Sequence, residues 1–213
     1  MKHKGWHSRD YLPHLDRAEC VQFVTFRLYD SIPAALIEQW RGELGVLTNH
    51  CQLPTDDLRL LELHRRLAAY EDAGHGACFL RALKIATTVQ SALIFFDPQR
   101  YRLLEWCIMP NHVHALVVTV SGQPMPDVIH SWKSYTAHAC NRILRRGGDF
   151  WMADYFDRYI RTAQHLAFIR NYIRDNPVKA GLCHAAEEWP WSSAYGARAS
   201  RPLAHCGRDA RAP

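Results

Sequence analysis

Two neighbouring apolar segments constrain the fold of this 213-residue chain more than any other feature. The segments YRLLEWCIM (101–109) and HVHALVVTV (112–120) are rich in β-branched and aromatic residues, which favour strands. Only Pro110 and Asn111 separate them, and a connection this short joins two antiparallel strands. The sequence therefore predicts a β-hairpin at the centre of the fold.

Two histidines, His112 and His114, open the second strand of that hairpin. Because strand side chains alternate between faces, both imidazoles point the same way, roughly 7 Å apart along the strand. This geometry suits one metal ion or one phosphate. Most histidines bind nothing, however, so the pair alone does not establish a binding site. Support for one has to come from other residues of the chain.

The remaining pattern alternates strands with helices. A first strand is expected at 20–28, and an extended stretch follows residue 150. Apolar periodicity predicts helices near 33–44, 56–70, 77–96, 126–145 and 162–175, and Asn176 and Pro177 should end the last one. This order predicts the α+β class with an antiparallel or mixed sheet and helices on one face. The ferredoxin-like split βαβ is the simplest such fold.

Length and composition indicate an ordinary folded protein. We expect one domain over residues 1–199, followed by a loose basic tail at 200–213. Seven scattered cysteines without a C-x-x-C pattern indicate neither a disulfide framework nor a zinc ribbon. The chain has no apolar run of the ~18 residues that span a membrane, and its start lacks the apolar core of a secretory signal, so we expect a cytoplasmic location.

The charge balance mildly favours a polyanionic partner. The net charge is +5, and the chain contains 7 tryptophans and 9 tyrosines, which can stack on unpaired bases.

The last predicted helix carries a second group of polar side chains. Tyr172 and Asn176 are four residues apart and therefore lie on one side of it. If this helix packs against the hairpin, two imidazoles and one side-chain oxygen could hold a divalent ion and leave positions open for phosphate oxygens. Tyrosine is a weak nucleophile at neutral pH and needs an electrophile activated in this way. A tyrosine beside an arginine is usually a packing residue, so only the joint pattern favours a nucleophile.

Four motifs resemble the REP-associated tyrosine transposases, a branch of the HUH single-strand DNA transposases. They are MPNHVHALV, DYFDRYIR, YIRDNPVKAGL and WPWSSAYG, and the resemblance covers roughly residues 11–196. It implies that His112 and His114 bind Mg²⁺ or Mn²⁺, with Asn176 as the third ligand. It also implies that Tyr172 attacks a DNA phosphate and forms a 5′-phosphotyrosine. The implied partner is single-stranded DNA with palindromic hairpins, bound by a monomer associated with the nucleoid.

One position departs from the motif. The usual sequence of this motif in that family is close to YIRNNPVKAGL, whereas Asp175 stands here in place of the first asparagine. Asp175 is either an added ligand or a solvated residue at the end of the helix.

Basic residues supply candidates for DNA binding. Arg158 and Arg161 lie near the expected site, where a planar guanidinium could hold phosphates. The long helix has a basic side made of Lys133, Arg142, Arg145 and Arg146. An ordinary charged surface explains Arg158 and Arg161 equally well, and for the long helix a solvated face is the commoner explanation.

Two other functions remain open from the sequence. One is a hairpin-binding regulatory protein without catalysis, which would need neither Tyr172 nor the histidine pair. The other is a metal-dependent phosphoesterase with water as the nucleophile, which would leave Tyr172 idle.

Overall fold

The computed structural model describes residues 5–8, 13–16, 19–46 and 57–196, with only the backbone described for the first two segments. The predicted basic tail, 200–213, lies outside these residues. None of the helices in the described part of the chain has the length and apolar character needed to cross a membrane.

Four strands form one antiparallel sheet in the order β4-β5-β3-β6. They are β3 (Val21–Arg27), β4 (Tyr101–Ile108), β5 (His112–Thr119) and β6 (Phe156–Tyr159). The predicted hairpin is β4-β5, and β3 pairs with the other side of β5. Two short strands, β1 (Gly5–Ser8) and β2 (Pro13–Asp16), pair separately. The predicted α+β class with a ferredoxin-like antiparallel sheet is confirmed.

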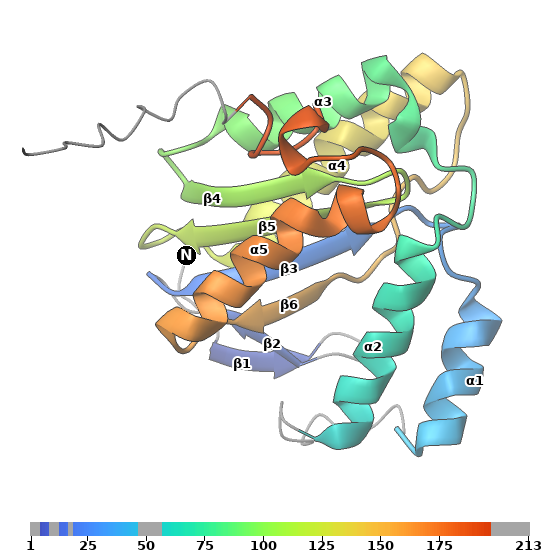
Figure 1. Ribbon diagram of the computed structural model, residues 1–213, viewed down its shortest axis with the longest axis vertical. Coiled ribbons are helices and arrows are strands. Elements are labelled where there is room, and N and C mark those ends of the chain that lie inside the picture. The colour runs from blue at the N-terminus through green and yellow to red at the C-terminus, as the bar shows by residue number, and fades with distance from the viewer. Residues whose placement is uncertain (1–4, 9–12, 17–18, 47–56, 197–213) are drawn as a thin grey trace, which may run out of the picture.

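The described residues also form five α-helices (Figure 1). They are α1 (Ala34–Leu44), α2 (Leu58–Asp72), α3 (Leu83–Phe95), α4 (Met125–Leu144) and α5 (Ala163–Lys179). Single 3₁₀ turns lie at Phe79–Arg81 and Ala186–Glu188. Helices α3 and α4 cover one face, α5 crosses the other, and α1 packs on α2 through a small core of its own (Figure 1).

The position of α5 differs from the expectation that all helices share one face. Alternate residues of the central strands are apolar on both sides: Val24 and Val113 pack toward α3 and α4, whereas Phe23 and Leu116 pack toward α5. Strands that are apolar on both faces require a cover on each. The near-continuous burial of β5 therefore explains why a helix lies on the second face.

The predicted end of the last helix at Asp175 was wrong. Helix α5 continues through Pro177 to Lys179. Proline lacks an N–H group and so removes one bond to the preceding turn, but the helix resumes because Ala180 N donates to Asn176 O at 2.9 Å. Asn176 and Pro177 are both buried, and this burial helps to offset the lost bond. Asn176 consequently keeps helical geometry, one turn after Tyr172.

Candidate metal centre and tyrosine site

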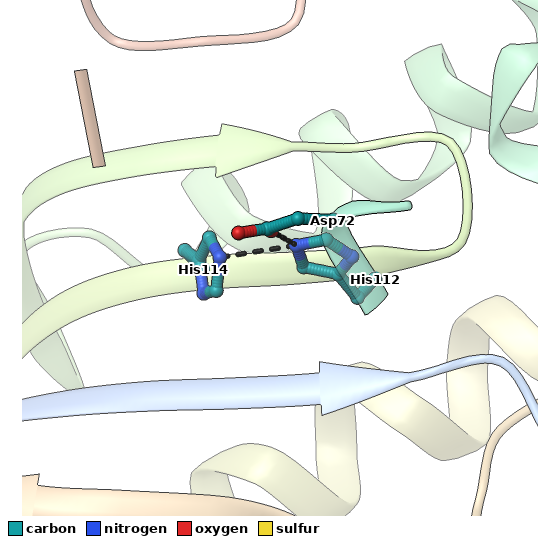
Figure 2. A group of neighbouring side chains, drawn as sticks. All are labelled: Asp72, His112 and His114. Carbon is teal, nitrogen blue, oxygen red and sulfur yellow. Dashed lines mark hydrogen bonds and ion pairs between the residues drawn. The ribbon is translucent and has the colours of Figure 1, made fainter. Parts of the chain in front are cut away.

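The two histidines meet at the start of β5, on the sheet face that α5 crosses. Both are buried, and their Nε2 atoms lie 3.0 Å apart (Figure 2). Two nitrogens bound at right angles to one ion, each at a distance of about 2.1 Å, would be separated by about 3 Å. The pair therefore has a spacing that suits a single cation.

Hydrogen bonds at the opposite ring nitrogens orient both imidazoles. His112 Nδ1 donates to Asn111 Oδ1 at 2.8 Å, and Thr25 Oγ1 lies 2.8 Å from His114 Nδ1. Thr25 stands directly opposite His114 in the β3–β5 register, which explains the second contact. Such bonds at Nδ1 leave the Nε2 lone pair free to bind a metal.

Asn111 also fixes the turn after α2. Its Nδ2 donates to the carbonyl oxygens of Glu71 at 3.2 Å and His75 at 2.9 Å, and its side chain is fully buried. One amide thus connects the orientation of the His112 ring to the end of α2.

We predict that Asn111→Ala lowers the free energy of unfolding by about 3 kcal/mol, because it leaves the buried donor at His112 Nδ1 unpaired and removes one hydrogen bond from each of the Glu71 and His75 carbonyl groups. Chemical denaturation would measure this loss. Asn171→Ala, at an exposed position of α5, is the matched control and should change stability by no more than about 0.5 kcal/mol. An equal effect of the two substitutions would refute the role assigned to Asn111.

Asp72, the last residue of α2, is a third member of the site that the sequence analysis missed. Its Oδ1 lies 3.7 Å from His112 Nε2, and the ligand atoms of Asp72, His112 and His114 all lie within 4.8 Å of one another (Figure 2). The predicted helix stopped at Tyr70, which left Asp72 in a turn. The available signal was the acidic pair Glu71-Asp72 at the end of a helix.

A buried ion pair holds this end of α2 against the sheet. Arg27 Nη1 donates to Glu71 Oε1 at 2.7 Å, and both side chains are almost fully buried. Arg27 stands opposite His112 in the β3–β5 register. The pair therefore places Asp72, the residue after Glu71, beside the histidines.

Helix α5 brings Tyr172 and Asn176 to the same place. Asn176 Nδ2 lies 3.2 Å from His114 Nε2 and 3.5 Å from Asp72 Oδ1. The Tyr172 ring meets the His114 ring with 5.2 Å between centroids. The i, i+4 spacing read from the sequence thus corresponds to two side chains that both contact the histidine pair.

The electrostatics keep the imidazoles and the phenol uncharged. Burial lowers the pKa of His112 to about 3, helped by the charge of Arg27, and burial likewise lowers the pKa of His114. Burial also raises the pKa of Tyr172 above its usual value, with further contributions from Asp72 and Glu71. The pKa of Asp72 rises to about 6, mainly through burial.

This donor set fits a divalent cation. Two neutral imidazole nitrogens face a carboxylate. Asn176 Oδ1 is buried without a hydrogen-bond partner in the described part of the chain, and a half-turn of the amide would bring it to the place of Nδ2, beside His114 and Asp72. Imidazole suits many divalent metals, and carboxylate and amide oxygens suit hard cations such as Mg²⁺ and Mn²⁺. The residues present can therefore hold a divalent metal ion.

The uncharged histidines predict a pH dependence of stability. Their pKa is lower in the folded than in the unfolded state, so the unfolded state binds more protons below about pH 6.5 and the stabilisation is lost as pH falls. For the metal-free protein we predict that stability, relative to His112→Gln/His114→Gln, falls by on the order of 3 kcal/mol from pH 7 to pH 5. Denaturation at several pH values would test this. If the stabilities of the wild type and of the double variant changed with pH in parallel, the histidine pair of the folded protein would be taking up protons.

The structure places the remaining candidates in different regions. Arg158 lies on β6 opposite Phe23, so it shares the sheet face of the histidines and lines a cavity beside Tyr172. Arg161 follows the end of β6 and is exposed. Asp175 is exposed and does not belong to the cluster of ligand atoms around Asp72.

The basic residues of α4 lie across the sheet from the histidine pair. Lys133, Arg142 and Arg146 line a groove of about 700 Å³ between α4 and the segment 146–153. Lys133 Nζ donates to the Met152 and Ala153 carbonyls at 2.6 Å each, and Arg145 ends α4 in a left-handed conformation. The Arg146 guanidinium lies 4.8 Å from the Tyr29 ring centroid. Two side chains of the predicted basic side, those of Lys133 and Arg146, therefore already make contacts within the protein.

The histidine pair on a central strand and the tyrosine and asparagine one helical turn apart all lie in a segment that resembles a known family. Residues 91–176, which include all four of these residues, match the family model described as "Transposase IS200 like". The resemblance found in the sequence motifs is confirmed: the chain is similar to IS200-like transposases.

Within that class the similarity is to REP-associated tyrosine transposases. The Escherichia coli (strain K12) protein of that name is 26% identical over 96 residues, 44% of this chain and 54% of the relative. A Haemophilus influenzae relative of the same kind is 27% identical over 97 residues, 41% of this chain and 55% of the relative. The chain thus spans about half the length of the curated relatives that it matches.

A solved structure of a REP-associated tyrosine transposase bound to a REP hairpin has the same fold. The match has a TM-score of 0.53 at 16% sequence identity and covers 92% of this chain and 88% of the other.

Proposed function

We propose that this protein is a metal-dependent single-strand DNA transposase, which nicks and rejoins DNA near palindromic hairpins through Tyr172. The observation that carries the proposal is the contact of Tyr172 and Asn176, one turn apart on α5, with the histidine pair of β5. A phenol beside a cluster of metal-binding groups is the combination that cleavage by tyrosine requires.

His112, His114, Asn176 and Asp72 would hold Mg²⁺ or Mn²⁺ in this proposal. When bound, the ion supplies a Lewis acid that polarises a phosphate oxygen of the DNA. Asp72 is an addition to the ligand set implied by the family resemblance. It supplies a carboxylate oxygen, the ligand that such hard cations prefer.

Tyr172 would act as the nucleophile. Its phenolic oxygen attacks the phosphorus, the bond from phosphorus to the 3′ oxygen breaks, and the 3′ end leaves as a hydroxyl group with the proton that the phenol gives up. The chain then carries a 5′-phosphotyrosine, and the reverse attack by a 3′ hydroxyl rejoins a strand. Burial raises the pKa of the phenol most, and the charges of Asp72 and Glu71 raise it further, so a cation bound beside Asp72 would favour the attack. Lys179 Nζ, 5.7 Å from the ring centroid of Tyr172, adds a positive charge that favours it further.

The proposed partner is single-stranded DNA that folds into a palindromic hairpin, bound by one copy of the domain formed by residues 1–199. Arg158 and Arg161 would contact phosphates near the site, and the basic residues of α4 would contact the DNA backbone elsewhere. The likeness to REP-associated transposases supports this choice of partner. We place the protein with the nucleoid in the cytoplasm, where such DNA is found.

The test is a cleavage assay with the purified protein, Mn²⁺ or Mg²⁺, and single-stranded oligonucleotides that carry a hairpin between randomised flanks. A covalent adduct of protein and DNA on a denaturing gel is the expected product. Cleavage without any adduct would instead indicate a phosphoesterase that uses water. Hairpin binding without cleavage would indicate a regulatory protein.

A further inference from the structure

A cavity adjoins the candidate site and has no part in the proposed chemistry. Its volume is about 350 Å³, and it lies between α2, β3, β6 and α5. Tyr172 and His114 form part of its wall, so the cavity opens directly beside the nucleophile and the metal-binding groups. Most of the remaining wall is aromatic or aliphatic, including Phe23, Phe156 and Phe168.

One polar group in this wall lacks a partner. His64, on α2, packs against Phe156 with 4.5 Å between ring centroids. Its ring forms no hydrogen bond within the described residues, and its Nε2 is closed to solvent. Burial and the charges of Arg158 and Arg27 lower the pKa of His64 to about 4, so the ring is neutral at physiological pH. A ligand in the cavity could therefore supply the hydrogen bond that this ring lacks.

The composition of the cavity indicates the chemistry of its occupant. Aromatic rings stack on nucleobases, and a neutral imidazole can form one directional hydrogen bond with the edge of a base. Arg158 also lines the cavity and is exposed, so its guanidinium can meet a phosphate outside. A volume near the lower limit of small-molecule pockets suits a single base rather than a longer segment.

We propose that this cavity binds one unpaired nucleobase of the DNA strand, that of a nucleotide next to the cleaved phosphate, and that the His64 ring in its wall selects the base by hydrogen bonding to its edge. The inference rests on the proposed function, because it places the base by reference to Tyr172. A base can enter such a cavity only after it leaves the helical stack, so the selected nucleotide is single-stranded. His64 is then a specificity residue that takes no part in the bond exchange.

The experiment sequences the oligonucleotides that form adducts when the nucleotides flanking the hairpin are randomised. Wild-type protein should prefer one base, by about tenfold or more, at a position next to the cleavage point. His64→Leu should reduce that preference to about twofold or less while still forming adducts. His64→Gln keeps a hydrogen-bonding side chain at this position and should keep a preference. His184→Leu, which replaces an exposed histidine near the end of the domain, should behave as wild type.

A second measurement needs no variant protein. With the selected sequence, an abasic nucleotide at the preferred position should lower the rate of adduct formation by wild-type protein about tenfold, whereas abasic nucleotides elsewhere in the flank should have little effect. If the wild-type preference persists in His64→Leu, or if no abasic position matters, the inference is wrong even though adducts form. If wild-type protein forms no adduct with any oligonucleotide, the proposed function itself fails.

Discussion

Tyr172→Phe is expected to abolish the covalent adduct between protein and DNA, with a loss of at least about 1,000-fold in the rate of its formation. The substitution removes the oxygen that would attack the phosphate and keeps the ring that packs on Phe23 and His114. Folding and hairpin binding should therefore change little. A denaturing gel measures the adduct, and a mobility-shift assay measures binding.

The matched control for this variant is Tyr195→Phe, which alters an exposed tyrosine after the last 3₁₀ turn. It should form adducts at the wild-type rate. Normal adduct formation by Tyr172→Phe would show that another residue attacks the DNA. Normal strand cleavage by that variant without an adduct would instead support a reaction in which water is the nucleophile.

His112→Ala/His114→Ala should eliminate both metal binding and DNA cleavage, because it removes both nitrogen ligands at once. Chelation of the metal from wild-type protein should have the same effect on cleavage, and added Mn²⁺ should restore it. Calorimetric titration with Mn²⁺ measures binding in the absence of DNA. Cleavage at the wild-type rate by the double variant, or in excess chelator, would rule out a metal-dependent reaction.

Asp72→Asn tests the ligand that was absent from the sequence prediction. We expect its affinity for Mn²⁺ to fall at least about tenfold. Asp175→Asn is the matched control, because Asp175 is exposed on α5 and should leave the affinity unchanged. If Asp175→Asn weakens Mn²⁺ binding and Asp72→Asn does not, the added carboxylate ligand comes from the tyrosine helix, and the assignment of Asp72 is wrong.

The sequence predicted those parts of the site that depend on local periodicity. The alternation of a strand placed His112 and His114 on one face, and the helical repeat placed Tyr172 and Asn176 on one side of α5. Both statements need only a few neighbouring residues. Their meeting in space depended on α5 packing over the hairpin, which a family resemblance could suggest and local pattern could not.

Asp72 and His64 were missed for a different reason. Both lie on α2, a helix with many charged side chains, and nothing in its sequence separates an inward carboxylate or imidazole from a solvated one. Their position depends on the Arg27–Glu71 ion pair and on the bonds from Asn111, which join segments about forty residues apart. Long-range contacts of this kind leave no periodic pattern.

The register of β3 has a consequence for the smallest portion of the chain that could work alone. A shortened polypeptide that begins at residue 91 would keep both histidines, the tyrosine and the asparagine. It would lack the strand that separates β5 from β6, since β3 pairs with both. It would also lose Thr25, which holds one imidazole, and the carboxylate at the end of α2. Truncation to the segment matched by the family model should therefore yield a fragment without a continuous sheet.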